Sequence, residues 1–205
     1  MLEQIGVNNM KKLLVCILFV LFGTQVFAQD FDKGRDAYKA GDYDTAVKEW
    51  KPLAEQGNAQ AQAAFGFMYK LGYGVLKDNA KAIKWWRLSA EQGYSYAQIF
   101  LGNMYKNGEG VLKDHAEAIK WYRLSAEQGD ASAQSNLGSM YVTGEGILRD
   151  NITAHMWYNI ASSNGHENAG KYRDELADQM TPEDISKATA MARECMASDY
   201  KKCGY

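Results

Sequence analysis

The sequence contains little proline, histidine or cysteine. Its 205 residues include two prolines, three cysteines and three histidines. Because proline interrupts helices, a chain whose prolines are Pro52 and Pro182 can be helical over most of its length. No histidine or cysteine stands in an H-x-x-x-H or C-x-x-C spacing, so we expect no metal site and no cofactor.

The sequence also lacks a strong excess of one charge. Its formal net charge is −2, which leaves no basic footprint for nucleic acid. No serine stands in the G-x-S-x-G pattern of hydrolases. We therefore predict a protein that is not an enzyme and does not bind nucleic acid, and we expect it to be a monomer.

Long hydrophobic runs are scarce as well. Leu13–Phe22 is uninterrupted and apolar, but ten residues fall short of the roughly 20 that span a bilayer as a helix. Lys11 and Lys12 precede the run, and Val26–Ala28 follows it with small residues at a cleavage position. This order is typical of a secretory signal peptide.

We therefore predict a signal peptide over residues 1–28, cleaved before Gln29. Met10 directly precedes the lysines and is an alternative start. The expected location is the periplasm or the extracellular space, since both destinations begin with the same signal. No stable membrane insertion is expected after cleavage.

Cleavage would leave two cysteines, Cys195 and Cys203. An even number of cysteines in an exported protein favours a disulfide. On one continuous helix they would lie about 12 Å apart, too far to bridge, so a disulfide requires the last helix to end between them. The alternative is a pair of free thiols near the end of the chain.

A repeat dominates the remaining sequence. Residues 54–89, 90–125 and 126–161 align without gaps at a period of 36, and the first two units agree at 24 of 36 positions. Repetition at this period indicates a solenoid of stacked units. We therefore predict an all-α fold built from antiparallel helix pairs.

Each unit contains two helical patterns separated by a G-x-G sequence. In the first unit, the first helix is expected from about Asn58 to Leu71, and Asp78 is placed to cap the second. Because G-x-G follows a helix instead of a strand, we interpret it as a helix end and not as a phosphate-binding loop. Glycines in mid-helix predict the close approach of a neighbouring helix; they are Gly66, Gly102 and Gly138.

The repeated motif is A-E-x-G-x-x-x-A-Q-x-x-L-G-x-M-Y-x-x-G-x-G-V-x-x-D-x-x-x-A-x-x-W-Y. It resembles the Sel-one-like repeat (SLR), a relative of the tetratricopeptide repeat. The resemblance implies a right-handed α-solenoid in which the first helices line a concave surface that binds peptides or proteins.

The flanking segments are expected to close the two ends of the stack. Residues 29–53 read as an N-terminal capping helical hairpin, and residues 54–165 contain the three repeat units. Residues 166–205 read as a degenerate repeat followed by a C-terminal capping helix, which Thr181 and Pro182 would begin.

Two recurring side-chain types on the second helices allow two interpretations each. The aromatic residues are expected in the core, although they could form a sugar-binding platform; they are Trp85, Trp86, Trp121, Tyr122, Trp157 and Tyr158. The basic residues are expected on a solvated outer face, although they could bind an anionic partner; they are Lys84, Arg87, Lys120 and Arg123.

Positions on the first helices that change from unit to unit are the candidate partner-binding residues. We expect them to lie opposite the core, where a partner would contact them. We call these eight residues the strip: Ala63, Phe67, Lys70, Ile99, Asn103, Lys106, Ser135 and Ser139.

The predicted function is an exported scaffold or adaptor for a protein or peptide partner. One alternative is weak β-lactam binding or hydrolysis, described for cysteine-rich relatives with a disulfide in every repeat, whereas this chain has no cysteine between residues 17 and 194. Another alternative is binding of carbohydrate or peptidoglycan through Tyr73, Tyr94 and Tyr96.

Overall fold

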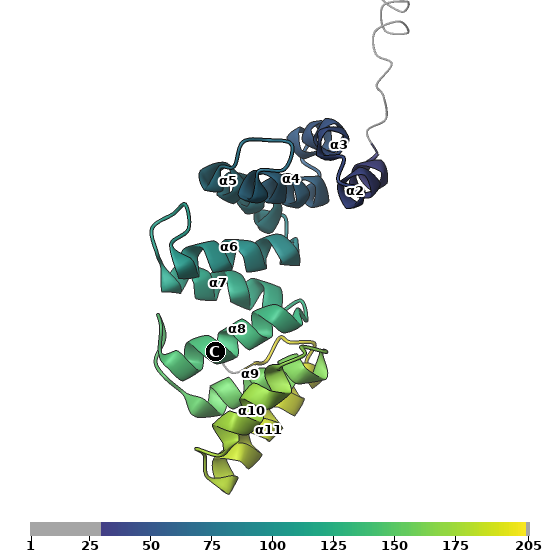
Figure 1. The fold of residues 1–205 in the computed structure, drawn as a ribbon. Helices are drawn as coiled ribbons and strands as arrows, with labels where there is room; N and C mark the ends of the chain where they lie inside the picture. Colours follow the sequence, from purple (N-terminus) through teal and green to yellow (C-terminus); the bar gives the residue numbers. More distant parts are fainter. Residues whose placement is uncertain (1–29, 204–205) are drawn as a thin grey trace, which may run out of the picture.

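The computed structural model describes residues 30–203, so the predicted signal peptide and its cleavage site lie outside the described residues. Within them the chain forms ten helices and no strand, which confirms the predicted all-helical repeat solenoid (Figure 1). The helices are α2 (Phe31–Lys39), α3 (Tyr43–Glu55), α4 (Ala59–Leu71), α5 (Asn79–Glu91), α6 (Ser95–Asn107), α7 (His115–Ala126), α8 (Ala131–Thr143), α9 (Asn151–Ser163), α10 (Ala169–Ala177) and α11 (Pro182–Ala197).

The units stack in chain order along the molecule (Figure 1). Each unit is a pair of helices, α4 with α5, α6 with α7 and α8 with α9, and each second helix also packs on the first helix of the following unit. Each unit therefore contacts mainly its neighbours, as expected when stability comes from the interfaces between repeats.

The helix ends form as the motif predicts. The side chains of Asp78, Asp114 and Asp150 each accept a hydrogen bond from a backbone N–H in the first turn of the second helix. Gly72 ends the first helix with φ of 77°, a left-handed conformation that side chains other than glycine rarely adopt. Its equivalents in the next two units have the same conformation.

The mid-helix glycines allow an aromatic ring to lie directly against the backbone. A Cβ on Gly66 would lie 2.6 Å from the Trp86 ring, and a Cβ on Gly102 would lie 2.6 Å from the Tyr122 ring. These contacts confirm the predicted close approach and assign it to the second helix of the same unit.

The same contact also builds the N-terminal hairpin. A Cβ on Gly34 would lie 2.5 Å from Trp50, and the Trp50 indole N–H donates to the Phe31 carbonyl oxygen at 3.0 Å. The hairpin α2–α3 thus uses the glycine–aromatic contact of the full units, although its sequence resembles them weakly.

A ladder of amide side chains joins consecutive units. The Gln62 and Gln98 side-chain amides each donate at 3.1 Å to a backbone carbonyl oxygen eight residues earlier, on Ala54 and Ala90. Gln92, in the turn after α5, donates to the side-chain oxygen of Gln62 at 2.7 Å. Because the buried amides are paired, the recurring A-Q sequence stabilises the stack instead of forming a site.

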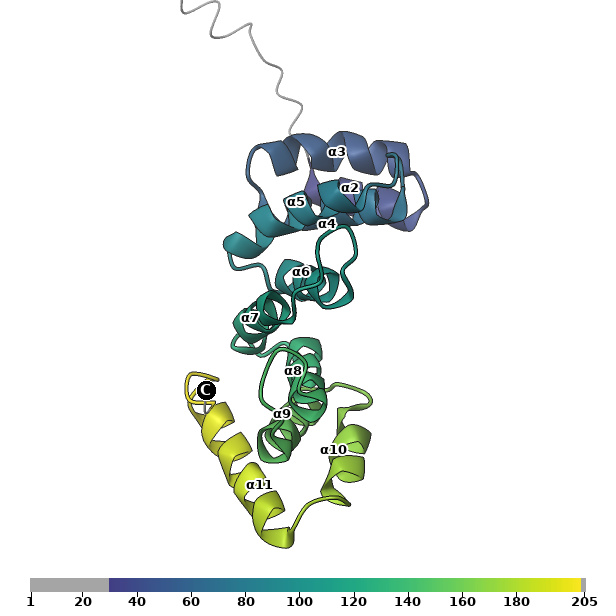
Figure 2. The same ribbon diagram turned by 90° about the vertical axis from the view of Figure 1, so that its left-hand side faces the viewer.

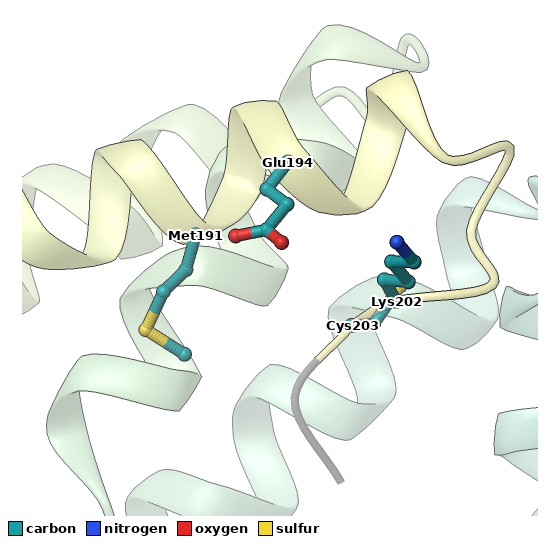
Figure 3. A pocket seen from close by; sticks show the side chains of 4 residues that line it. All are labelled: Met191, Glu194, Lys202 and Cys203. Carbon is teal, nitrogen blue, oxygen red and sulfur yellow. The ribbon is translucent and has the colours of Figure 1, made fainter.

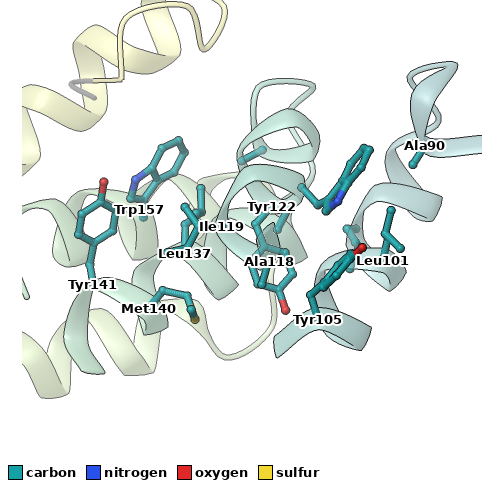
Figure 4. Packing of buried hydrophobic residues seen from close by; sticks show 14 of the residues in the cluster. Ala90, Leu101, Tyr105, Ala118, Ile119, Tyr122, Leu137, Met140, Tyr141 and Trp157 are labelled. Carbon is teal, nitrogen blue, oxygen red and sulfur yellow. The ribbon is translucent and has the colours of Figure 1, made fainter. Parts of the chain in front are cut away.

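The recurring aromatic residues are mostly core, as predicted (Figure 4). Trp86, Tyr122 and Trp157 are buried, and Trp121 and Tyr158 are nearly so. Trp85 is half-buried and packs edge-on against Phe65, with 5.3 Å between ring centroids. This burial leaves the set little surface for a sugar-binding platform.

The last helix does not continue the stack. Helices α10 and α11 both pack on α9 and lie on opposite sides of it (Figure 2). Met156 and Ile160 on α9, the helix that α11 contacts, are fully buried. The equivalent residues of the first unit are Lys84 and Leu88, both exposed. The contact with α11 therefore accounts for the methionine at position 156, where the first two units carry lysine, whereas Ile160 retains the apolar character of Leu88.

The tail after α11 folds back onto the stack. Cys195 and Cys203 are joined in a disulfide, with their Cα atoms 4.5 Å apart. The Tyr200 ring lies against Gly129, and its hydroxyl forms a hydrogen bond with Asn164. The tail thus connects the end of α11 to the ends of α7 and α9.

Candidate functional site

The strip is less exposed than the sequence suggests. Ala63, Ile99 and Ser135 are buried, so the expectation that they face away from the core is wrong. The cause is that each first helix packs both on its own second helix and on the second helix of the preceding unit. The other five strip residues are half-buried.

The strip residues lie at three equivalent places, each formed by a first helix, its second helix and the next first helix. We call these places the first, middle and last junctions; they involve α4, α5 and α6, then α6, α7 and α8, then α8, α9 and α10. Adding 36 to a residue number gives the equivalent residue of the following junction.

The first junction is filled by aromatic rings. The Phe67 ring lies edge-on to Phe100 and to Trp86, with centroid separations of 4.3 and 5.3 Å. Trp86 and Phe100 are themselves stacked at 5.4 Å, and the Trp86 indole N–H donates to the Ala63 carbonyl oxygen at 3.1 Å. This end of the strip is apolar.

The middle junction contains a partly buried polar contact. The Tyr122 hydroxyl donates to the side-chain oxygen of Asn103 at 2.6 Å. Burial raises the pKa of Tyr122, so this hydroxyl keeps its proton and remains a donor. Asn103 is the equivalent of Phe67, so the same position changes from apolar to polar along the strip.

The last junction contains an open cavity of about 350 Å³, which we call the junction pocket. Burial raises the pKa of Tyr158 in its wall, and a hydrogen bond with Ser139 acts against this shift. Tyr158 and Tyr172 also border a second hollow of about 170 Å³ beside Val142. The junction pocket is lined by Ser135, Asn136, Ser139, Tyr158, His166 and Tyr172.

Two of these six residues, Ser135 and Ser139, belong to the predicted strip. Asn136, His166 and Tyr172 were not singled out, and Tyr158 was expected in the core, with a sugar-binding platform as the alternative. These lining residues share one place in the repeat. Subtracting two periods, or 72, from each residue number gives a residue at the first junction. Applying the period to the whole junction, instead of to one helix, would have grouped them.

The lysines of the strip differ in their contacts. Lys70 at the end of α4 forms an ion pair with Glu109 in the loop after α6, and this pairing holds the pKa of Glu109 below its usual value. Lys106 is half-buried, and within residues 30–203 it has no ion pair or side-chain hydrogen bond. Lys106 is therefore the strip cation that is available to a partner.

The basic residues of the second helices divide into two groups. Lys84 and Lys120 are exposed, as predicted for an outer face. Arg87 and Arg123 are half-buried, and each donates to a tyrosine hydroxyl of the next first helix, on Tyr105 and Tyr141. The arginines thus contribute to contacts between units, which corrects their assignment to a solvated face.

Two other surface features are a row of exposed leucines and a hollow near the C-terminus. The loops between the paired helices each expose a leucine, and the exposed fractions of Leu76, Leu112 and Leu148 are 91, 89 and 86%. A hollow of about 200 Å³ lies between α11 and the returning tail, where Glu194 and Lys202 face it from either side (Figure 3). This hollow belongs to the C-terminal closure.

Carbohydrate binding through the other predicted tyrosines has weak support. Tyr73 stacks on Tyr43 at 4.2 Å between centroids, so its ring packs against the N-terminal hairpin. Tyr96 is exposed, and the centroid of its ring lies 5.8 Å from that of Tyr94.

Among residues 30–203 there is no cluster of three histidine, cysteine or acidic side chains that could hold a metal ion. None of the described helices has both the length and the apolar character needed to cross a membrane.

Comparison with known proteins identifies the repeat. A family model described as the Sel1 repeat matches residues 53–94, 95–130 and 131–166. A crystal structure of a Sel1 repeat protein from Oxalobacter formigenes is 32% identical, with a TM-score of 0.70 over 83% of this chain and 72% of that chain. No curated protein matches the chain.

A second solved structure shows the same fold. It is c5321, a protective antigen of uropathogenic Escherichia coli strains displaying an SLR fold, and it is 27% identical with a TM-score of 0.57. The match covers 76% of this chain but 42% of that one, so c5321 extends well beyond the shared region.

Proposed function

This chain belongs to the Sel1 repeat family, whose members generally mediate protein–protein interactions, and we propose that it is an exported scaffold that binds a protein or peptide along the strip. The observation that carries the proposal is the changing chemistry of equivalent strip positions. Phe67, Asn103 and Ser139 differ completely, whereas the glycine and aromatic contacts behind them are retained. Packing alone would favour one residue at all three places.

The strip also has the layout of a surface for an extended partner. Its N-terminal end is aromatic at Phe67 and Phe100, its middle offers Lys106, and its C-terminal end opens into the junction pocket. In Figure 2, α6, α8 and α10 lie along one side of the molecule, opposite α7 and α11. A partner following this side would meet three different chemistries in a fixed order.

The partner can be captured with a matched pair of variants. The strip variant combines Lys106→Glu with Val142→Lys, because Val142 occupies the position that carries lysine in the first two units. The control combines Lys120→Glu with Leu124→Lys on exposed positions of α7 and has the same charge change. After crosslinking in the cell envelope, affinity purification of the strip variant should recover at least tenfold less partner than the wild type. The control should recover as much partner as the wild type. Loss with the control alone would contradict the proposal.

Export is the second part of the proposal and rests on the predicted signal over residues 1–28. Intact-mass measurement of the native protein should give a chain that begins at Gln29, and fractionation should place it outside the cytoplasm. A cytoplasmic protein that retains the leader would refute this part and leave the binding site untouched.

β-Lactam hydrolysis remains an alternative without geometric support. A Ser-x-x-Lys spacing occurs at Ser198–Lys201, but the Ser198 hydroxyl donates to the Cys195 carbonyl oxygen at 2.8 Å. Lys201 lies 3.9 Å from Asp199 and is exposed, so no base activates the serine. Purified protein should therefore not hydrolyse nitrocefin, and turnover by the wild type that Ser198→Ala abolishes would overturn this conclusion.

A further inference from the structure

The junction pocket occupies the space that a side chain fills elsewhere in the same protein. At the first junction the Phe67 ring packs against Trp86 and Phe100, whose own rings are 5.4 Å apart. At the last junction the equivalent rings, Tyr158 and Tyr172, are 5.6 Å apart, so the aromatic wall is retained. The equivalent of Phe67 is Ser139, which is too small to cover it.

The middle junction shows a second way to occupy the same place. There Asn103 stands at the position of Ser139, and its carboxamide oxygen accepts the Tyr122 hydroxyl at 2.6 Å. Tyr122 is the equivalent of Tyr158. The protein therefore contains one junction closed by a phenyl ring, one by a carboxamide, and one whose tyrosine wall borders a cavity of about 350 Å³.

The pocket lining limits the chemistry of a ligand group. Its polar groups are hydroxyls, one carboxamide and one imidazole, and no aspartate, glutamate, lysine or arginine lines it. A charged group would enter without an opposite charge and would lose solvation, which is unfavourable. An uncharged group with both a donor and an acceptor can pair with these hydroxyls, and a planar one can also lie on a tyrosine ring.

We propose that the junction pocket receives a carboxamide side chain, glutamine or asparagine, from the partner polypeptide. In this arrangement the ligand carboxamide oxygen accepts a hydrogen bond from the Tyr158 hydroxyl, as Asn103 does from Tyr122, and displaces the present contact of that hydroxyl with Ser139. This inference rests on the proposed function, because the side chain belongs to a partner that lies along the strip. It adds the residue type that the last junction recognises.

The repeat itself supplies variants that should close the pocket without unfolding the chain. Ser139→Phe introduces the residue of the first junction, and Ser139→Asn introduces the residue of the middle one. Ser132→Phe makes a matched change at an exposed position of the same helix, α8. Thermal unfolding of all three variants identifies any that lose the fold.

The probe is a displayed library of random dodecapeptides selected on residues 29–205, with affinities measured by fluorescence polarisation. Selected peptides should share a glutamine or asparagine at one position. Changing it to glutamate or leucine should weaken binding to the wild type at least tenfold, because the buried hydroxyls lose their partner. Ser139→Phe and Ser139→Asn should weaken binding equally, whereas Ser132→Phe should not.

The outcomes distinguish failure of this inference from failure of the proposed function. Peptides that bind the strip without a carboxamide preference, or that bind folded Ser139→Phe as tightly as the wild type, would refute the pocket assignment alone. If no peptide binds, peptide recognition along the strip fails and the inference fails with it. If chitin or peptidoglycan fragments bind and Ser139→Asn abolishes that binding, the pocket is a saccharide site and the inference is wrong.

Discussion

Replacement of His155 by isoleucine should stabilise the protein and flatten the dependence of its stability on pH. His155 on α9 occupies the position of Ile83 and Ile119 in the earlier units, and all three side chains are buried. The Nδ1 atom of His155 is buried without a hydrogen-bond partner. Isoleucine at this position is therefore already compatible with the repeat and carries no unpaired polar atom.

The magnitude follows from the burial of the imidazole. An unpaired buried polar group destabilises by about 1–3 kcal/mol, so we expect His155→Ile to raise the free energy of unfolding by about 1–2 kcal/mol at pH 8. Burial is the main cause that lowers the pKa of His155, and the positive charge of Arg173 on α10 lowers this pKa further. Asp174, which also lies on α10, opposes the shift. The folded protein therefore disfavours the imidazolium.

The direction of the pH effect follows from linkage. Above the unfolded pKa of about 6.5 the imidazole is neutral in both states and contributes no pH dependence. Below that value the unfolded chain binds a proton that the folded chain does not, so wild-type stability falls as the pH drops toward the lower folded pKa. The slope from this one group is at most about 1.4 kcal/mol per pH unit.

The assay is urea unfolding, followed by circular dichroism, at pH 8, 7, 6 and 5. The control is Ile119→Val, which changes the equivalent buried position of α7 without adding or removing a titratable group. The gain from His155→Ile should widen between pH 7 and pH 5, whereas Ile119→Val should retain the wild-type slope in that range. A destabilised His155→Ile, or one whose pH slope equals that of the wild type, would refute the reasoning.

Three further predictions concern the stack. Gly102→Ala would stabilise an open helix by about 1 kcal/mol, but its Cβ would lie 2.6 Å from the Tyr122 ring. Chemical denaturation should therefore show a net loss of about 1–3 kcal/mol in the free energy of unfolding. A net gain would show that the ring moves freely. The double variant Cys195→Ser, Cys203→Ser removes a disulfide across a sequence separation of 8. Because the unfolded chain gains loop entropy, the free energy of unfolding should fall by about 2.5 kcal/mol. An unchanged melting temperature under oxidising conditions would argue against this bridge. Asp114→Ala removes the N-cap of α7 and should lose about 1 kcal/mol in urea unfolding, and Asp114→Asn serves as its control because it retains a capping oxygen.

Much of the fold could be predicted because its determinants are local. The aspartate caps, the left-handed glycines and the two helical patterns each depend on a few neighbouring residues, and the 36-residue period repeats them. The glycine–aromatic contact was predicted only as a close approach, because the sequence does not say which ring meets which glycine. Gly102 and Tyr122 are 20 residues apart, and only the packed pair of helices brings them together.

The position of α11 could not be predicted for a different reason. A helix that follows the last unit can extend the stack or fold back, and both arrangements bury an apolar face. The decisive signal is on α9, where Met156 and Ile160 replace residues that are exposed in the first unit. The exchange of lysine for Met156 can be read from the sequence, but only the covering helix gives it a cause.

The sequence grouped the strip residues as equivalent positions of the units but did not predict their burial. The strip was expected to be an open face, whereas Ala63, Ile99 and Ser135 are buried at the junctions. The pocket depends on side chains from three helices, including Tyr172 on α10, where the repeat has degenerated. Single-helix periodicity cannot group such residues, because they meet only when consecutive units stack.

Site-directed photo-crosslinking tests the central claim most directly. A photo-crosslinking amino acid is placed in turn at Lys106 in the strip, at Lys120 on the outer face of α7, and at Leu112 in an exposed loop. We predict that irradiation of intact cells joins one partner to the protein through position 106 and not through the other two. A partner joined through position 120 or 112, and absent at 106, would contradict binding along the strip.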